Sequence, residues 1–355
     1  MSRQSHPAKA QPRRPFIIRH RKILLILLGI FIGISATIYL LNTFAFQPVK
    51  DPVFGVTFSR ERSEEFGLDW KANFLALLDD MKLKHFRLMS YWDAGEPSQG
   101  QFDFGDLDWM MTQAAKRGAT VSLSIGLRQP RWPECHQPDW ARQLAGNAWK
   151  QALYAYMEVV AKRYRSNPAL ESWQLENEAV NTWFGECGAP DYQRLHEEFG
   201  LLKQWDPKHP IIMSLSDEHG LPIFTPVPDE YGFSVYRIVY NTFGPHFYTY
   251  YPAPLWYHRL RAAIITLMYH KPIIIHELQM EPWGPEDTKN LSIAEQNKSM
   301  SAQQIDGNFT FAEKIGLQKI DLWGGEWWYW RKVHFGDDSI WNAVKAAIKT
   351  GESRH

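Results

Sequence analysis

Short apolar runs alternate with amphipathic stretches along most of the chain. Eight runs have the length of β-strands, and several are rich in β-branched and aromatic residues. They cover residues 53–59, 85–91, 120–126, 172–178, 211–216, 231–236, 272–277 and 319–323. The run PIIIHE at 272–277 is almost continuously apolar, which is typical of a parallel strand buried on both faces.

Most intervals between these runs carry the spacing of a helix. Phe74, Leu77, Leu78 and Met81 recur at i, i+3, i+4 and i+7, which predicts a helix that buries one face. Further helices are expected at 107–114, 153–160, about 191–205, 260–267, about 301–315 and 340–348. We interpret the series as eight β/α pairs, and this alternation predicts a parallel sheet with crossover helices.

Eight β/α units close naturally into a barrel, so we predict an α/β fold with a (β/α)8 TIM barrel. A doubly wound open sheet is the alternative. It usually has fewer strands, and no glycine-rich phosphate-binding turn follows the first run. The segment 237–254 is interpreted as an aromatic loop. Its end, HFYTYYPAP, is either a sugar-stacking wall or a packed loop.

A separate apolar segment precedes the barrel. The stretch ILLILLGIFIGISATIYLL at 23–41 has about the length that a helix needs to cross the hydrocarbon layer. Residues 1–22 carry seven Lys/Arg and no acid, and basic flanks stay on the cytoplasmic side. We therefore predict a basic cytoplasmic tail at 1–22, a transmembrane signal anchor at 23–44, a linker at 45–52 and an extracytoplasmic catalytic domain at 53–355.

The main alternative for this segment is a cleaved signal peptide, which would give a secreted protein. A signal peptide normally has a shorter apolar region, and no clear small-x-small cleavage site lies before Gln47. Gly29 and Gly33 form a small-xxx-small pair that would permit dimerisation through the helix, although such pairs are frequent in membrane spans.

Charge and aromatic content narrow the possible partners. The net charge is zero, but beyond residue 22 the chain carries 32 basic against 39 acidic residues, a net charge of −7. An acidic body argues against a nucleic-acid partner, because binding to phosphates depends on basic surface. The 16 Trp, 15 Tyr and 20 Phe are unusually many, and sugar-binding clefts are one common reason. A Trp-rich core explains some of them.

The carboxyl ends of the predicted strands carry the candidate chemistry, because active sites of such barrels lie at that rim. Acids, an arginine and several aromatic residues converge there. In chain order these candidates are Arg87, Trp92, Trp132, Asn177, Glu178, Tyr236, Glu277 and Trp323.

Two of these candidates, Glu178 and Glu277, are carboxylates that end the fourth and seventh runs. Cleavage of a glycosidic bond needs such a pair, one protonated to assist the leaving oxygen and one ionised to attack or to activate water. Arg87 would hold Glu277 ionised. Glu176 is ambiguous: alternation places it on the same face as Glu178, yet it also suits a buried partner of Arg87. His276, opposite Glu277, is interpreted as a core histidine.

Three motifs resemble the clan A retaining glycoside hydrolases, which include cellulase-, mannanase- and β-galactosidase-like enzymes. They are WQLENEA at 173–179, IIIHELQMEPW with Glu277, and DLWGGEWW with Trp323. RLMSYWDAGEPSQGQFDFGDLDWMM is similar to the strand-two and helix-two region of several members. The resemblance covers nearly the whole domain from about Val53. It implies a barrel in which Glu178 is the acid/base and Glu277 the nucleophile.

The resemblance also implies roles for the residues around the two acids. Asn177 would bind the sugar 2-hydroxyl, Arg87 and Tyr236 would orient the nucleophile, and Trp323 would form the floor of the subsite nearest the bond. Trp92 and Trp132, at the same rim, complete the predicted substrate-binding set.

The chain departs from the clan pattern in three places. Relatives often carry a histidine after strand three, where this chain has GLRQPRWPE. They tend to have His-x-Tyr on strand six, where it has Ser234-Val235-Tyr236, and a proline where it has Ala179. These departures concern the exact family and substrate more than the clan.

The two cysteines, Cys135 and Cys187, fall in the loops after the third and fourth runs. Adjacent strands of a barrel place these loops side by side, and an even pair in an exported domain is a disulfide candidate. We predict a disulfide beside Glu178, with two unrelated thiols as the alternative.

Together these observations predict a membrane-anchored retaining β-glycosidase that hydrolyses a β-linked oligo- or polysaccharide by double displacement. No cofactor is expected, and no His-Glu-x-x-His or Cys-x-x-Cys sequence indicates a metal site. Two alternatives stay open. One is a catalytically inactive carbohydrate-binding barrel that acts as a surface sensor or adhesin, and the other is a transglycosidase that uses the same residues.

Overall fold

The computed structural model describes residues 16–40, 49, 51–217, 220–242, 247–250 and 253–352. The chain divides into two compact units, Met1–Phe46 and Gln47–His355. The boundary between them lies inside the predicted linker 45–52.

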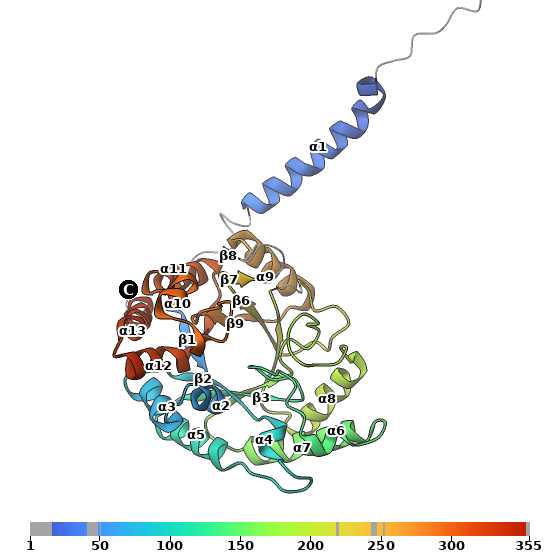
Figure 1. Cartoon of the computed structure of the whole chain (residues 1–355). Helices are drawn as coiled ribbons and strands as arrows, with labels where there is room; N and C mark the ends of the chain where they lie inside the picture. The colour runs from blue at the N-terminus through green and yellow to red at the C-terminus, as the bar shows by residue number, and fades with distance from the viewer. Residues whose placement is uncertain are drawn as a thin grey trace, which may run out of the picture. The chain divides into compact units, whose positions relative to one another are not determined.

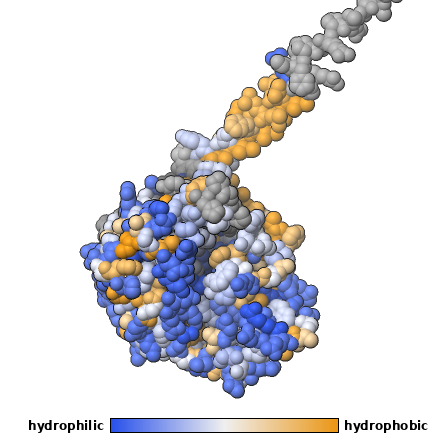
Figure 2. Space-filling view, in the orientation of Figure 1, coloured by the Kyte–Doolittle hydropathy of each residue, from blue (hydrophilic) through white to orange (hydrophobic). Residues whose placement is uncertain are grey.

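Helix α1 (Phe16–Leu40) is the described part of the first unit. Its stretch Arg21–Leu40 is long and apolar enough to cross a membrane. Figure 2 shows the hydrophobic surface of this helix. The last residues of the predicted span 23–44 lie outside the described part of the chain.

Eight parallel strands close into a barrel in the second unit (Figure 1). Around the barrel the order is β1, β10, β9, β6, β5, β4, β3 and β2. Every position of β2, β5 and β9 is buried, which explains their almost continuous apolar composition. The strands are β1 (Val53–Thr57), β2 (His85–Met89), β3 (Thr120–Ile125), β4 (Leu170–Leu175), β5 (Ile211–Leu215), β6 (Glu230–Val235), β9 (Ile273–Gln279) and β10 (Lys319–Trp323). The predicted (β/α)8 barrel is confirmed, and an open sheet is excluded.

Most helices that surround the barrel bury the predicted apolar stripes, but Leu267, at the end of the stripe expected at 260–267, is 72% exposed. Those that were expected are α3 (Trp70–Asp79), α5 (Gly105–Lys116), α7 (Ala148–Tyr164), α8 (Tyr192–Trp205), α9 (Leu255–Tyr269), α11 (Ala302–Ile315) and α13 (Ser339–Glu352). Further elements were not predicted: α2 (Arg60–Glu65), α4 (Trp92–Gly95), α6 (Asp139–Arg142), the 3₁₀ turn η2 (Thr288–Asn290), α10 (Ile293–Ser299) and α12 (Gly325–Phe335). Most of these are shorter than the eight residues that the i, i+3, i+4, i+7 pattern needs.

Two features of the second half differ from the prediction. The described residues between β5 and β6 contain no helix, so the expected count of eight complete β/α pairs is wrong. The supposed loop 237–254 contains an antiparallel hairpin, in which β7 (Ile238–Asn241) pairs with β8 (Phe247–Tyr250). β-Branched and aromatic residues in both segments favour strands, but four residues are too few to show an alternation.

The barrel interior contains a polar column in addition to the branched apolar side chains usual for this fold. His276 Nδ1 lies 2.8 Å from Asp321 Oδ2, and His85 Nε2 lies 3.5 Å from Asp321 Oδ1. His85 Nδ1 in turn lies 2.7 Å from Glu171 Oε2. Gly55 makes room for the column, because a Cβ there would lie 2.2 Å from Asp321 Oδ1. His276 is the buried core histidine that we expected, and burial lowers its pKa to about 4.

A disulfide joins the loop after β3 to the loop after β4. It links Cys135 to Cys187, whose Cα atoms are 5.4 Å apart. Two hydrogen bonds tie the same loops: the Glu186 N–H donates to the Pro133 carbonyl at 2.9 Å, and Arg128 Nη2 donates to the Phe184 carbonyl at 2.7 Å. The two loops are therefore connected at three points.

Replacing both cysteines by serine (Cys135→Ser with Cys187→Ser) should lower the free energy of unfolding by about 2–4 kcal/mol, because the cross-link restricts the unfolded chain. The cysteines are 52 positions apart, so the loop released is long. Urea denaturation of the full chain measures the change. As a control, a thiol reagent added to denatured, unreduced wild type should find no reactive thiol; two reactive thiols would contradict the disulfide.

Candidate active site

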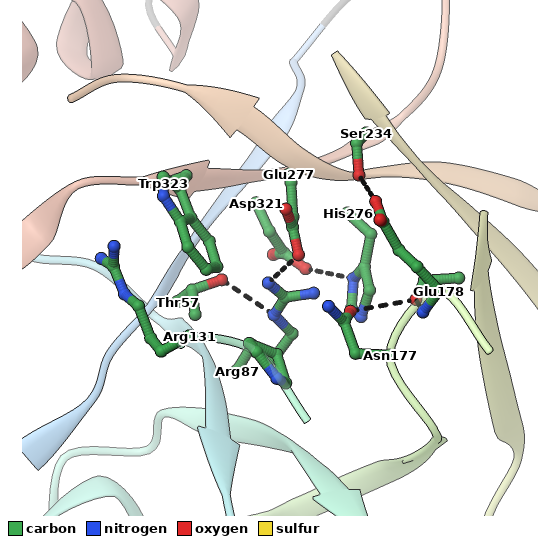
Figure 3. Close-up of polar contacts among 12 residues, drawn as sticks. Thr57, Arg87, Arg131, Asn177, Glu178, Ser234, His276, Glu277, Asp321 and Trp323 are labelled. Atoms are coloured by element: carbon green, nitrogen blue, oxygen red, sulfur yellow. Dashed lines mark hydrogen bonds and ion pairs between the residues drawn. The ribbon is translucent and has the colours of Figure 1, made fainter. Parts of the chain in front are cut away.

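The polar side chains predicted at the strand ends gather at one mouth of the barrel (Figure 3). They come from β2, β9 and β10 and from the turns after β4 and β6. Parallel strands present all their carboxyl ends at the same rim, which is why residues distant in sequence meet there.

Glu277, near the end of β9, accepts hydrogen bonds from two side chains. Arg87 Nη2 donates to its Oε1 at 2.6 Å, and the Tyr236 hydroxyl donates to its Oε2 at 2.9 Å. Arg87 Nε also donates to Thr57 Oγ1 at 2.8 Å, which fixes the guanidinium. Burial and the Glu277 carboxylate raise the pKa of Tyr236 well above its usual value, so its hydroxyl stays a donor. Both oxygens of the Glu277 carboxyl group therefore accept from side chains outside β9.

Glu178 follows β4 and accepts hydrogen bonds from Ser234 and Asn181. The Ser234 hydroxyl donates to its Oε1 at 2.6 Å, and Asn181 Nδ2 donates to its Oε2 at 2.8 Å. Ser234 is the register partner of Glu277 between β6 and β9. Neighbouring strands are about 4.8 Å apart, so this serine brings the two carboxyl groups to the same part of the mouth. Figure 3 shows Glu277 beside Arg87 and Glu178 beside Ser234.

The turn Glu176-Asn177-Glu178 has an unusual backbone. Glu176 and Glu178 have φ angles of +52° and +46°, in the left-handed region that residues other than glycine seldom occupy. Such conformations cluster at functional sites, where the surrounding structure holds them. They also end the alternation of β4, so the expectation that Glu176 and Glu178 share a face is wrong.

Glu176 has a structural role. Its Oε1 accepts from the Leu127 N–H at 2.6 Å and from Arg194 Nη1 at 2.8 Å, and its Oε2 accepts from the Arg128 N–H at 2.9 Å. It therefore pairs with Arg194 of α8 and not with Arg87, the partner suggested by its sequence position. Gly126 makes this possible, because a Cβ there would lie 2.5 Å from Glu176 Oε1.

Asn177 is held in one orientation. Its Oδ1 accepts from Gln174 Nε2 at 3.0 Å and from Ser214 Oγ at 3.1 Å, while its Nδ2 donates to Glu134 Oε2 at 3.0 Å. An amide nitrogen carries two hydrogens, so one remains to donate to a ligand. Figure 3 places Asn177 between Arg87 and Glu178.

Glu134 is a third acid that the sequence did not suggest. Glu134 is buried. In addition to the hydrogen bond from Asn177, its Oε2 lies 3.6 Å from Arg128 Nε. Burial, opposed by Arg128, raises the pKa of Glu134 to about 8, and the nearby charges of Glu178 and Glu277 add to the effect. Glu134 therefore carries a proton at neutral pH.

Trp323 lies at the mouth but is enclosed by charged groups. Its indole N–H donates to Glu281 Oε1 at 2.8 Å, and the Arg131 guanidinium lies 3.9 Å from its ring centroid. Arg131 also donates to Glu281 and, at 2.8 Å, to Glu326 Oε2. One face of the predicted subsite floor is thus covered by a cation.

Trp92 and Trp132 differ in how far their side chains are exposed. Trp92 is fully buried in α4, packs against Trp140 and Tyr156, and donates its indole N–H to Glu96 at 2.8 Å. Its predicted contact with substrate is wrong, because the short helix turns the ring into the core. Trp132 is 58% exposed at the rim.

Sequence reasoning missed several residues that complete the site: Arg131, Glu134, Asn181, Ser234, Glu281 and Glu326. A signal existed for the first two, since GLRQPRWPE places three charged residues directly after a strand end. Among the described residues, no group of three His, Cys, Asp or Glu side chains is arranged to hold a metal ion.

Carboxyl groups at the mouth of a closed parallel barrel, one of them paired with a buried arginine, define a glycoside hydrolase-like TIM barrel. Comparison with known proteins agrees. A family model described as Beta-galactosidase matches residues 69–205. A curated Beta-galactosidase from Arthrobacter sp. is 28% identical over 132 residues, which are 31% of this chain and 19% of that protein. The chain therefore spans about a fifth of the length of this relative.

Solved structures share the fold at low sequence identity. The cold-adapted β-galactosidase from Rahnella sp. R3 superposes with a TM-score of 0.57 at 13% identity, over 86% of this chain and 56% of that chain. A GH5_18 protein from Bifidobacterium longum subsp. longum, solved in complex with Manβ1-4GlcNAc, gives a TM-score of 0.58 at 12% identity, over 85% of this chain and 78% of that chain. The chain is similar to the clan A barrels that its motifs resemble.

The raised pKa of Glu134 predicts a pH-dependent stability. In the folded protein Glu134 keeps its proton up to about pH 8, whereas in the unfolded chain it loses it near the ordinary value of 4.5. The folded state therefore binds the extra proton, and stability falls as the pH rises from about 4.5 to 8. Glu134→Gln should remove this loss, so its free energy of unfolding relative to wild type should rise by about 4 kcal/mol across that range.

Urea denaturation at a series of pH values between 5 and 8 measures this difference. Glu186→Gln, which removes an exposed carboxyl from the loop bonded to Pro133, is the matched control for the change in charge. Parallel pH profiles for wild type and Glu134→Gln would contradict a buried, protonated Glu134.

Proposed function

We propose that the chain is a membrane-anchored retaining β-glycosidase that cleaves β-linked oligo- or polysaccharides by double displacement. The observation that carries this proposal is the arrangement of Glu178 and Glu277 around Ser234, which bonds the first and is the strand neighbour of the second. Retaining enzymes hold their two carboxyl groups about 5–5.5 Å apart, and we expect that separation here.

Glu277 is the proposed nucleophile. Its Oε1 accepts from the Arg87 guanidinium and its Oε2 from the Tyr236 hydroxyl, and these donors fix the orientation of the carboxyl group. Attack on the anomeric carbon forms a glycosyl-enzyme bond while the bond to the leaving oxygen breaks. The hydrogen bond from Arg87 Nε to Thr57 Oγ1 holds the guanidinium in this position.

Glu178 is the proposed acid/base. Its two carboxyl oxygens accept hydrogen bonds from the Ser234 hydroxyl and the Asn181 amide. Glu178 donates a proton to the leaving oxygen, then takes a proton from the water that hydrolyses the glycosyl-enzyme. Asn177, fixed by three partners, is the proposed donor to the sugar 2-hydroxyl.

The proposed location follows from the first 44 residues. The basic tail at 1–22 stays in the cytoplasm, the apolar helix crosses the membrane, and residues 53–355 form the extracytoplasmic catalytic domain. The substrate class draws on the β-galactosidases among the relatives, so aryl β-galactosides are the first substrates to test.

Substitution of either acid should abolish most turnover. Glu178→Ala and Glu277→Ala should each lower kcat on the best aryl β-glycoside by about 10²–10⁴-fold, because each removes a group that acts on the reacting bonds. The full chain in detergent is assayed against aryl β-galactoside, β-glucoside, β-mannoside and β-xyloside, with Glu186→Gln as a control of unchanged activity.

Azide separates the two roles. It should restore turnover to Glu277→Ala with an inverted glycosyl azide as product, and to Glu178→Ala with a retained one. Proton NMR of the anomeric centre reads the stereochemistry of these products and of the wild-type reaction. Inverted sugar from the wild type would contradict double displacement, and binding of glycans without turnover would contradict a hydrolase.

A further inference from the structure

A carboxylate and two histidines lie inside the barrel close to the Arg87–Glu277 pair. Asp321 of β10 has one oxygen 2.8 Å from His276 Nδ1 and the other 3.5 Å from His85 Nε2. All three side chains are buried. We call Asp321, His85 and His276 the carboxylate bridge, because one carboxyl group reaches both histidines. Figure 3 draws the bond between Asp321 and His276 among the site residues.

The carboxylate bridge joins the same two strands as the ion pair. His85 lies two positions before Arg87 on β2, and His276 directly precedes Glu277 on β9. These strands are not neighbours in the barrel, because β1 and β10 lie between them. The two strands that must approach each other for Arg87 to reach Glu277 are therefore connected twice, once by that pair and once through Asp321.

An irregularity in β9 brings His276 and Glu277 to the same side of the strand. Two residues of β9, His276 and Glu277, lie opposite one residue of β10, Asp321. On the other edge of β9, the pairing with β6 shifts between Phe233 and Ser234. Successive residues of a regular strand point to opposite faces, and a bulge with one extra residue breaks this alternation. The direction of Glu277 is therefore set at the same bulge that holds His276.

Two strands carry glycine where the carboxylate bridge needs room. A Cβ on Gly55 of β1 would lie 2.2 Å from Asp321 Oδ1, and a Cβ on Gly232 of β6 would lie 2.6 Å from the His276 Cβ. Glycine inside a strand weakens it and packs no side chain, so it often marks a place where another group approaches closely. The barrel gives up two side chains to admit the carboxylate bridge.

Asp321 is a buried anion near a buried cation. Burial opposes ionisation of its carboxyl group, but the two histidines and Arg87 outweigh burial and lower the pKa of Asp321. Burial also lowers the pKa of His276 to about 4, so its ring is neutral and Nδ1 carries the hydrogen that bonds Asp321. Among the described residues, Arg87 Nη1 is buried without a hydrogen-bond partner. Hydrogen bonds alone do not hold the guanidinium, and the charge of Asp321 contributes to its placement.

We propose that Asp321 is a positioning residue: its carboxylate ties β2 to β9 and so sets the geometry in which Arg87 meets Glu277. Asp321 does not touch substrate, because its side chain is fully buried. It acts through the two histidines, each of which lies within two positions of a member of the ion pair. This inference rests on the proposed function, under which Glu277 is the nucleophile, and adds to it a residue that holds the nucleophile in place.

The first test removes the charge of Asp321 and keeps the size of its side chain. Asp321→Asn should lower kcat on the best aryl β-glycoside by about 10²-fold, the loss expected when a reacting group is misplaced by about 1 Å. KM should stay close to that of wild type, because no contact with substrate is removed. The full chain in detergent is assayed. A loss that lies mainly in KM, or an unchanged kcat, would overturn the proposal.

Asp206→Asn is the matched control. Asp206 and His209 form another buried pair, with Asp206 Oδ2 2.6 Å from His209 Nδ1. This pair lies between α8 and the amino end of β5, which is the end of the barrel opposite the mouth. Asp206→Asn should keep the kcat of wild type even where urea denaturation shows that it lowers stability as much as Asp321→Asn. Equal losses of kcat in the two variants would overturn the proposal.

Substitutions of His276 test the hydrogen bond to Asp321. The amide of His276→Asn can donate to Asp321 from the position of the imidazole Nδ1, whereas His276→Leu has no donor. His276→Leu should lose about 10²-fold in kcat, and His276→Asn should recover most of that loss. Equal kcat in these two variants would overturn the proposal, and this comparison decides it if Asp321→Asn does not fold.

Crystal structures separate this proposal from the proposed function. In Asp321→Asn the distance from Arg87 Nη2 to Glu277 Oε1 should exceed the limit of about 3.2 Å for a hydrogen bond, whether or not any glycan is cleaved. A displaced pair in a chain that shows no turnover even as wild type would retain the positioning role and reject the hydrolase. An undisplaced pair would overturn the positioning role and leave the proposed function standing.

Discussion

The ion pair between Arg87 and Glu277 is the interaction on which both fold and site depend. Both side chains are buried, and a buried charge is strongly destabilising unless its partner is in place. The pair bridges β2 and β9, which are not neighbours in the barrel. Thr57 from β1 and Tyr236 after β6 complete it, so it forms only when the barrel has closed. Closure of the barrel and placement of the Glu277 carboxyl group are therefore the same event.

A second constraint is that the acidic residues near the barrel mouth have different partners. Glu176 gives its oxygens to the backbone of the β3 loop and to Arg194, whereas Glu178, two residues later, faces the mouth. Glu134, protonated in the folded protein, adds no negative charge beside them. Glu134, Glu178 and Glu277 can then lie close together without mutual repulsion, because Glu277 is paired with the Arg87 cation and Glu134 is neutral.

Much of the fold was predictable because its signals are local. Strands buried on both faces and helices with one apolar stripe leave a clear trace in the sequence, and Arg87 and Glu277 were found from their positions at strand ends. Arg131 and Glu134 were not, because left-handed backbone at both residues turns them into the mouth from a loop. The prediction for Trp92 was wrong for a different reason: a position at the rim does not determine which way an indole points. The β7–β8 hairpin was too short to show its period.

The disulfide between Cys135 and Cys187 links the structure of the barrel mouth to the redox state of its surroundings. It joins the segment that carries Glu134 to the segment that carries Asn181, and these two residues donate to or accept from the turn at Asn177 and Glu178. Disulfides persist in oxidising compartments and are rare in the cytosol. Under the proposed extracytoplasmic location, this cross-link forms only once the domain has reached an oxidising compartment.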